Sequence, residues 1–285
     1  MTLAFGWLVV FIAVIGGFAW AGGNPTSLFV GAEWSVVGGC AIGYIVASSP
    51  KTVLKLLWAQ IVRSFRGSPY TAQVYTELVQ MLYEIFRVGR QQGIISLETH
   101  VLEPLKSPIV GRYPSFLANH DAIEFFSDAM KPVIDGKLKA DQLKISLDEQ
   151  INSKERHAHG PVTVLNKVAD ALPGLGIVAA VMGIIITMAH IAGDVSAVGE
   201  YVAHALVGTF LGVFLCYGIV QPLSLNMEFL NEDELSYLIV IRSGIVAFAS
   251  GSSPMTAAES MRNSIPKDRR IGSEDMETLL KSMKG

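Results

Sequence analysis

The chain has 285 residues, of which 51% are apolar and 16% are charged, and its mean hydropathy is +0.42. This composition is too apolar for an ordinary soluble domain, so it indicates a membrane protein. The net charge of -3 and the lack of a dense basic cluster argue against nucleic acid as a partner.

The first two apolar runs, residues 3–22 and 28–49, are each about as long as the ~20 residues that cross a bilayer core. The first run is too long for a secretory signal and lacks its basic start and cleavage site, so we expect a membrane span. Glu33 lies a few residues inside the second run, and we expect it at the outer rim as a carboxylate that faces water. Glycines in both runs predict close helix packing: Gly16, Gly17, Gly22, Gly23, Gly38, Gly39 and Gly43.

The segment between residues 51 and 167 is polar, and its apolar residues recur with helical rather than strand periodicity. It therefore predicts a helical cytoplasmic domain between two membrane hairpins. The predicted helices are 71–92, ended by Gly93; 97–106, capped by Ser96 and stopped by Pro108; 115–135; and 139–159, ended by Gly160 and Pro161.

Two further apolar runs, residues 172–192 and 201–221, form the second predicted hairpin. Neither contains Asp, Glu, Lys or Arg, and the Gly208-x-x-x-Gly212 spacing favours close helix contact. A proline falls in the first turn of one run and another follows the second run, so both are predicted at the same membrane face. Such a hairpin can line a pore, but it has no acid to carry an ion. The two prolines are Pro173 and Pro222.

A long helix is predicted to continue past Pro222 to residue 250 and to end at Gly251. Its apolar part, residues 235–249, is short for a span, and Arg242 in its middle would cost about 2.5–3.5 kcal/mol in a bilayer. We therefore expect a buried cytoplasmic helix and four spans in all.

All 22 Lys and Arg residues fall in two segments, residues 51–167 and 242–284. By the positive-inside rule both segments are cytoplasmic, which also places both termini inside. Cys40 and Cys216 fall in predicted spans, where we expect packing rather than a structural disulfide.

The sequence offers little for enzymatic chemistry. It has no GxxxxGK[ST] phosphate-binding loop, so ATP is not the expected energy source. His157 and His159 have no Cys or acid at metal-ligand spacing, so we expect no metal site. His190 and His204 flank the outer turn, where they can titrate near neutral pH, but we expect them to be polar residues at the water boundary.

Arg90 and Glu98 mark the ends of two predicted helices that meet at a corner. Arg90 lies in the last turn of the first helix and Glu98 in the first turn of the second, so each charge complements its helix dipole. The two charges at an exposed corner also suit electrostatic contact with a partner protein. The residues by themselves leave both interpretations open.

Three stretches of the chain resemble the flagellar motor stator A subunit family, MotA, within the broader MotA/TolQ/ExbB group. They are LPGLGIVAAVMG around Pro173, AHALVGTFLG before Pro222, and FRVGRQQGIISLE, which includes Arg90 and Glu98. The likeness covers nearly the whole chain and includes the order of two spans, a large insert, two spans and a tail. Residues 271–285 do not follow the family pattern, so no role is transferred to them.

The residues and the resemblance together predict an all-α polytopic membrane protein with four transmembrane helices. A helical cytoplasmic domain lies between the second and third spans, and a helical tail follows the fourth. The predicted segments are the first transmembrane hairpin, 1–50; the cytoplasmic domain, 51–168; the pore-lining hairpin, 169–222; and the cytoplasmic C-terminal helix and tail, 223–285.

The resemblance also implies a function: an ion-driven, torque-generating stator subunit of the flagellar motor in the bacterial inner membrane, with no cofactor and no enzymatic activity. Five copies would surround two copies of a single-span subunit like MotB, each with an ion-binding aspartate, and membrane lipid would surround the complex. Pro173 and Pro222 would be conformational elements of the power stroke. Arg90 and Glu98 would meet complementary charges on the rotor switch protein FliG.

The coupling ion is predicted from Ala180 and Thr209. Sodium-driven members of the family resemble one another in having a threonine at the position of Ala180, where a hydroxyl can replace part of the oxygen shell of Na⁺. Here this position carries a methyl group, and Thr209 keeps one hydroxyl. With the resemblance this favours H⁺ over Na⁺; without it, Ala180 is simply a small packing residue.

Two other functions stay open from the sequence. An energising TolQ-like or ExbB-like proton channel subunit for outer-membrane import or integrity resembles the last two spans, but it has three spans and lacks the Arg90 and Glu98 corner. A purely structural membrane scaffold would leave the two prolines and the charge-free hairpin without a use. The number of spans separates the first of these from a stator subunit.

Overall fold

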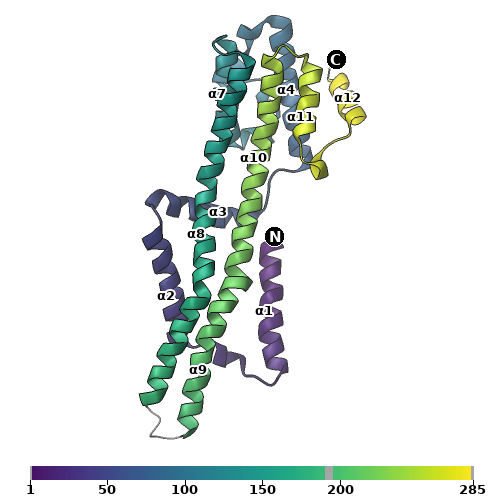
Figure 1. Ribbon diagram of the computed structural model, residues 1–285. Coiled ribbons are helices and arrows are strands. Elements are labelled where there is room, and N and C mark those ends of the chain that lie inside the picture. The colour runs from purple at the N-terminus through teal and green to yellow at the C-terminus, as the bar shows by residue number, and fades with distance from the viewer. Residues whose placement is uncertain (1, 190–194, 284–285) are drawn as a thin grey trace. The chain divides into compact units, whose positions relative to one another are not determined.

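The structure, a computed structural model, describes residues 2–189 and 195–283, and every regular element in these residues is a helix (Figure 1). Four helices are long and apolar enough to cross a membrane, which confirms the predicted all-α class and the four spans. The chain divides into two compact units, each built from two separate segments. We call Met1–Gly67 with Ala158–Leu230 the membrane unit, and Ser68–His157 with Asn231–Gly285 the cytoplasmic unit.

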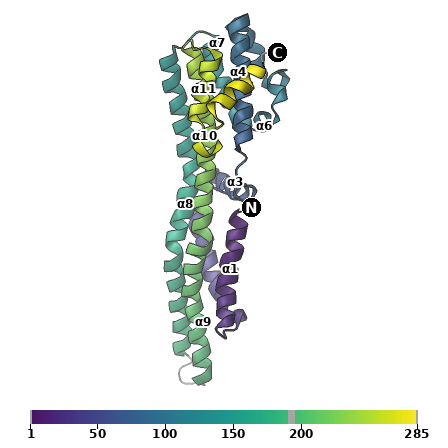
Figure 2. The ribbon, with the colours of Figure 1, turned by 90° about the vertical axis from the view of Figure 1, so that its right-hand side faces the viewer.

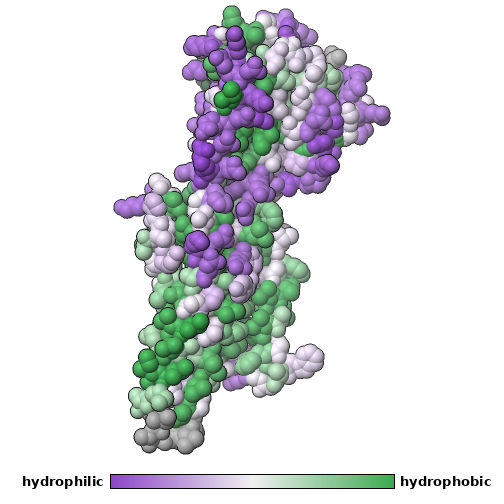
Figure 3. All heavy atoms as spheres, viewed as in Figure 1, coloured by the Kyte–Doolittle hydropathy of each residue, from purple (hydrophilic) through white to green (hydrophobic). Residues whose placement is uncertain are grey.

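The membrane unit is a set of apolar helices in which α8 and α9 lie side by side (Figures 1 and 2) and α2 packs along α9. Large side chains such as Ile177 and Ile185 are exposed, and apolar residues cover much of this unit in Figure 3, a surface that is stable in lipid rather than in water. Its elements are α1 (Thr2–Trp20), a 3-10 turn (Pro25–Leu28), α2 (Gly31–Ser48), α3 (Lys51–Arg66), the later part of α8 (Ala140–Ala189), α9 (Val195–Phe214), a π-helical turn (Leu215–Val220) and the start of α10 (Gln221–Ala249).

The amphipathic helix α3 follows α2 after a single turn. Leu57 is buried, whereas Trp58 and Phe65 are exposed, and Lys51 and Lys55 lie near the start of the helix. Exposed aromatic rings and lysines on a helix with one buried face are typical of the membrane–water interface, because both groups contact lipid headgroups. The fold therefore provides a lipid-facing helix at the end of the first hairpin.

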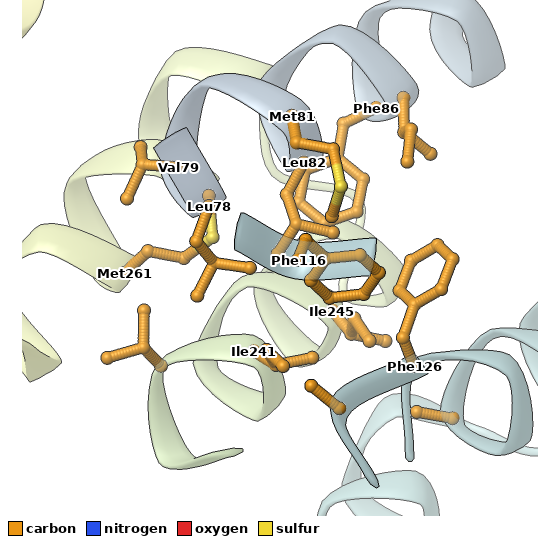
Figure 4. Packing of buried hydrophobic residues seen from close by; sticks show 14 of the residues in the cluster. Leu78, Val79, Met81, Leu82, Phe86, Phe116, Phe126, Ile241, Ile245 and Met261 are labelled. Atoms are coloured by element: carbon orange, nitrogen blue, oxygen red, sulfur yellow. The ribbon is translucent and has the colours of Figure 1, made fainter. Parts of the chain in front are cut away.

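The cytoplasmic unit packs helices from both of its segments around one apolar core. Figure 4 shows its centre, where side chains of α4, α6, α7, α10 and α11 meet. Phe86 of α4 stacks on Phe248 of α10 with ring centroids 4.5 Å apart. Its elements are α4 (Ala72–Gln92), α5 (Glu98–Leu102), α6 (Pro114–Leu117), α7 (His120–Ile134), the first part of α8, the later part of α10, α11 (Pro254–Ser264) and α12 (Ser273–Ser282), with short 3-10 turns between some of them.

Two predicted helix ends are confirmed at glycines. α4 starts after Thr71, whose side chain accepts a hydrogen bond from the Val74 N–H, and it ends at Gly93. The long helix α10 ends just before Gly251. Both glycines have positive φ, 90° and 86°, which other residues disfavour, so these helix ends are specified locally.

The apolar part of α10 is a buried helix of the cytoplasmic unit, as predicted. Ile241 and Ile245 are fully buried in the core, and Arg242 forms an ion pair with Asp148 of α8. A charge paired with an acid inside the protein avoids the cost of an unpaired charge in lipid.

The predicted helix end at Gly160 and Pro161 is wrong, because α8 continues through both residues and through Pro173. An interior proline removes one backbone hydrogen bond and costs about 3 kcal/mol. Tertiary contacts offset this cost, since Pro161 is buried and the Gln60 Nε2 donates to the Ala158 carbonyl at 3.0 Å. Packing within the membrane unit thus overrides the local signal.

Two more predicted helices have the wrong bounds. Ser96 does not cap a helix; its Oγ donates to a carbonyl of the preceding turn at 2.6 Å, and α5 is short because Pro104 follows it. α6 and α7 replace the single helix predicted for 115–135. Asn119 between them accepts a hydrogen bond from the Ala122 N–H at 3.1 Å and caps α7.

The predicted close packing of glycines in the first hairpin is also wrong within this chain. A Cβ added at six of the seven would meet no atom within 4 Å, because α2 packs along α9 instead and leaves these faces open. The six are Gly16, Gly17, Gly22, Gly38, Gly39 and Gly43.

The core of the cytoplasmic unit supplies a matched test of stability. Leu82 is fully buried, whereas Leu105 of the same unit is 73% exposed. We expect Leu82→Ala to lower the free energy of unfolding by about 2–5 kcal/mol, because it leaves a cavity. Leu105→Ala should change it by no more than about 0.5 kcal/mol. Thermal unfolding of the detergent-solubilised protein measures both, and equal losses would contradict the core described above.

Candidate functional site

A close backbone contact in the membrane unit joins α8 and α9 through small residues. A Cβ on Gly176 would lie 2.6 Å from the carbonyl oxygen of Gly208, and a Cβ on Gly212 would lie 2.5 Å from that of Leu172. Real Cβ atoms do not approach this closely, so the two backbones touch only because glycine occupies these positions. The close contact predicted from the Gly208-x-x-x-Gly212 spacing is confirmed.

Of the two residues predicted to line the ion path, Ala180 lies at this contact. A Cβ on Gly208 would come within 3.1 Å of the backbone nitrogen of Ala180, and Thr209 is the next residue on α9. Ala180 is 8% exposed, and Thr209 is half-buried. The helix contact thus places Ala180 against Gly208, the residue that precedes Thr209 on α9.

Pro173 and Pro222 both interrupt helical hydrogen bonding, but in different ways. The sequence predicted Pro173 in the first turn of a separate helix. This is wrong, because Pro173 lies inside α8. Pro222 follows the π-helical turn, whose end is marked by a bond from the Gln221 N–H to the Cys216 carbonyl. The wider turn relieves the clash between a proline ring and the carbonyl four residues earlier.

The two prolines are not level along the hairpin. Gly212 lies against Leu172, one residue from Pro173, whereas Ser224 donates to the Val162 carbonyl at 3.4 Å, close to Pro222. At a rise of 1.5 Å per residue, the prolines are separated by about 15 Å along the helix pair. Their role in the power stroke stays a prediction.

Glu33 differs from its sequence prediction. It is 6% exposed rather than facing water, and its Oε2 is buried without a hydrogen-bond partner. The carboxylate is buried because α2 packs on α9. A Cβ on Gly208 would lie 2.6 Å from Oε2, so there is room for the carboxylate only because residue 208 is a glycine without a side chain. His204 is half-buried on α9, while His190 lies outside the described residues.

Arg90 is less free than the predicted corner required. It lies in the last turn of α4 and its guanidinium donates to the carbonyls of Gly251 and, at 3.0 Å, Ser252. It also lies over the Phe248 ring, 5.8 Å from the centroid. Arg90 therefore binds two carbonyls of the turn between α10 and α11 and holds that turn in place.

Glu98 is exposed at the first turn of α5. Two residues on, the Nδ1 of His100 lies 2.7 Å from the Ser107 Oγ, and burial lowers the pKa of this histidine. The neutral imidazole thus fixes one side of α5, while Glu98 faces solvent. Of the two predicted corner charges, Glu98 is the one available to a partner.

A cavity of about 690 Å³ opens beside Arg90 on the surface of the cytoplasmic unit. Arg87 also lines it and donates to the Met283 carbonyl at 2.8 Å. The cavity wall includes Ser253, which caps α11 by accepting from the Thr256 N–H. Two guanidinium groups next to a helix N-terminus favour contact with acidic groups.

Sequence reasoning missed two features. Within the described residues, the possible metal-ligand atoms of His120, Asp121 and Glu124 lie within 4.8 Å of one another. Lys154, however, forms an ion pair with Asp121 and lowers the pKa of that carboxyl. The i, i+1, i+4 spacing on one helix could have revealed this cluster. Glu33 was noticed, but its burial could not be read from the sequence because the hole that accepts it belongs to α9.

Comparison with known proteins fits this geometry. Residues 4–93 match the family described as motility protein A N-terminal, and residues 118–232 match the MotA/TolQ/ExbB proton channel family. Motility protein A of Salmonella typhimurium is 31% identical over 284 residues, which cover 100% of this chain and 96% of that protein. The chain belongs to the motility protein A family.

Other relatives support this assignment. Chemotaxis protein LafT of Vibrio parahaemolyticus is 32% identical and covers 98% of both chains. The fold matches a C. jejuni MotAB structure with a TM-score of 0.79 and 21% identity over 94% of this chain and 96% of that one. A flagellar MotAB stator complex from Bacillus subtilis gives a TM-score of 0.74 and 18% identity over 97% and 98%. This member of the family is a multi-pass protein of the bacterial inner membrane.

The α8–α9 contact predicts opposite outcomes for two neighbouring glycines of α8. Gly176→Ala should separate the helices and abolish motility, because its Cβ would collide with the Gly208 carbonyl. Gly174→Ala should be tolerated, since nothing lies within 4 Å of its added Cβ. Swimming in soft agar, with immunoblots of membrane fractions, measures the effect. Equal motility of the two variants would contradict the contact.

Proposed function

We propose that this chain is the ion-driven, torque-generating stator subunit of a bacterial flagellar motor. Its relatives are named motility protein A, and the structures with the same fold are MotAB complexes. By this relation five copies would surround two copies of a single-span subunit like MotB. The glycine faces that α1 and α2 leave open within one chain support contacts with further chains.

The observation that carries this proposal is the charge-free, closely packed hairpin. Residues 172–189 and 201–220 contain no Asp, Glu, Lys or Arg, so this wall needs a partner carboxylate to move an ion through it. The interior Pro173 and the π-helical turn before Pro222 weaken the backbone of both helices where they would have to move. The role is transport and force generation rather than catalysis.

The proposed ion is the proton. Sodium needs several oxygen ligands, whereas a proton needs one acceptor and a path through hydroxyl groups or water. Ala180 offers a methyl group at the α8–α9 contact and Thr209 one hydroxyl, which is too little oxygen for a dehydrated sodium ion. A stator subunit is favoured over an energising subunit of import systems because the match to the motility family includes the first hairpin.

The experiment on the ion uses single-motor rotation of tethered cells. Replacing sodium by potassium at fixed pH removes only the sodium gradient and should leave the rotation speed unchanged. A protonophore collapses the proton gradient and should stop rotation. Rotation that stops without sodium and survives the protonophore would overturn the proton assignment. Rotation that continues under both treatments would contradict the proposal that an ion gradient drives the motor.

The rotor contact is proposed at the cytoplasmic corner, with the rotor switch protein FliG as partner. Glu98 supplies an exposed negative charge, and Arg90 and Arg87 supply positive charge at the neighbouring cavity. Arg90 also holds the turn between α10 and α11. Replacing it would therefore change the structure of the corner as well as its charge. Glu98 is therefore the sharper probe.

Glu98→Lys should leave the protein at its normal level in the membrane and reduce swimming, since an exposed charge adds only about 0.5 kcal/mol to stability but steers a partner. Glu155→Lys, an equal change at another exposed acid of the cytoplasmic unit, is the control and should swim normally. A charge reversal on FliG should partly restore the Glu98→Lys motor. Normal swimming of Glu98→Lys would remove this residue from the contact.

A further inference from the structure

The described part of the membrane unit buries one acidic side chain, that of Glu33 in the first turn of α2. Its Oε2 has no hydrogen-bond partner among the residues that the structure describes, and the residue is 6% exposed. An ionised carboxylate without a partner is costly in such a place, and a proton or a desolvated cation removes that cost. A buried carboxylate oxygen without a partner is thus suited to binding a proton.

Three helices meet at this oxygen. A Cβ on Gly208 of α9 would lie 2.6 Å from Oε2, 3.0 Å from the Ala179 Cβ and 3.1 Å from the Ala180 nitrogen. The carboxylate therefore occupies the gap that Gly208 leaves, beside the α8 residue proposed to line the ion path. A packing role alone would be met by any side chain of this size, and the apolar surroundings would favour an apolar one.

The titratable groups nearest in helical position to the carboxylate lie on α9. His204 lies one turn before Gly208 on α9 and is half-buried. Tyr201, three residues earlier, is on the same side of α9 by helical spacing. On α8, Ala179 and Ala180 lie beside Gly208 at this point. An acid and a histidine together form a pair that can pass a proton.

We propose that Glu33 is a proton-binding site of this chain on the ion path, with His204 as its neighbouring proton-exchanging group. This inference rests on the proposed stator function and adds to the partner's aspartate a second carboxylate, supplied by the subunit itself. In each cycle Oε2 would take up one proton from the outer side and release it toward the partner's aspartate, so the carboxylate returns to its starting charge. One oxygen among methyl groups suits a proton and gives sodium too few ligands.

The test uses the whole complex, copurified with its single-span partner and reconstituted in vesicles with a pH-sensitive dye inside. Glu33→Gln keeps the size of the side chain but cannot exchange a proton, and we expect the proton flux to fall about 10-fold or more, as for other positioned proton-transfer groups. Glu33→Asp should keep part of the flux. Glu200→Gln, the same change at an exposed acid of α9, is the control and should conduct like the unchanged complex.

The outcomes separate the two proposals. No proton flux from the unchanged complex, or flux only in sodium, overturns the proton-driven function itself. Normal flux from the unchanged complex and equal flux from Glu33→Gln overturns the Glu33 site alone. If Glu33→Gln does not copurify with the partner, His204→Gln is compared over a range of external pH. A shifted pH dependence of flux supports the site, and an unchanged one overturns it.

Discussion

The structure of the membrane unit depends on the backbone contact between α8 and α9. Gly176, Gly208 and Gly212 allow the two helices to approach until main-chain atoms touch, which no other residue permits. This approach places Ala180 beside Gly208 and leaves the gap that the Glu33 carboxylate enters. A side chain added at any of the three positions would disturb the helix contact, the proposed ion path and the buried acid together.

Helix continuity is the second constraint on how the protein can work. α8 passes through Pro161 and Pro173 without ending, and α10 follows directly from a π-helical turn at Pro222. Each of these helices contributes residues both to the membrane unit and to the cytoplasmic unit. The prolines therefore weaken hydrogen bonding in helices that belong to both units, which is where a motion of the membrane hairpin would have to be transmitted.

The cytoplasmic corner shows how one residue can have a structural and a functional use. Arg90 binds the carbonyls at the end of α10 and lies over Phe248, so it is part of the framework that positions α11. Glu98 makes no comparable contact and is exposed. The two charges look equivalent in the sequence, but only the glutamate can be changed without disturbing the fold.

Much of this protein was determined by the sequence alone, because membrane thickness and helical periodicity act on local segments. The four spans, the Gly93 and Gly251 helix ends and the small-residue contact of α9 all followed from such signals. The tertiary structure alone decided where α8 continues and what surrounds Glu33. These features depend on contacts between segments far apart in the chain: Gln60 supports α8 near Pro161, and Gly208 makes room for the acid. A local proline signal carries no information about such neighbours, and neither does the position of an acid near the start of a span.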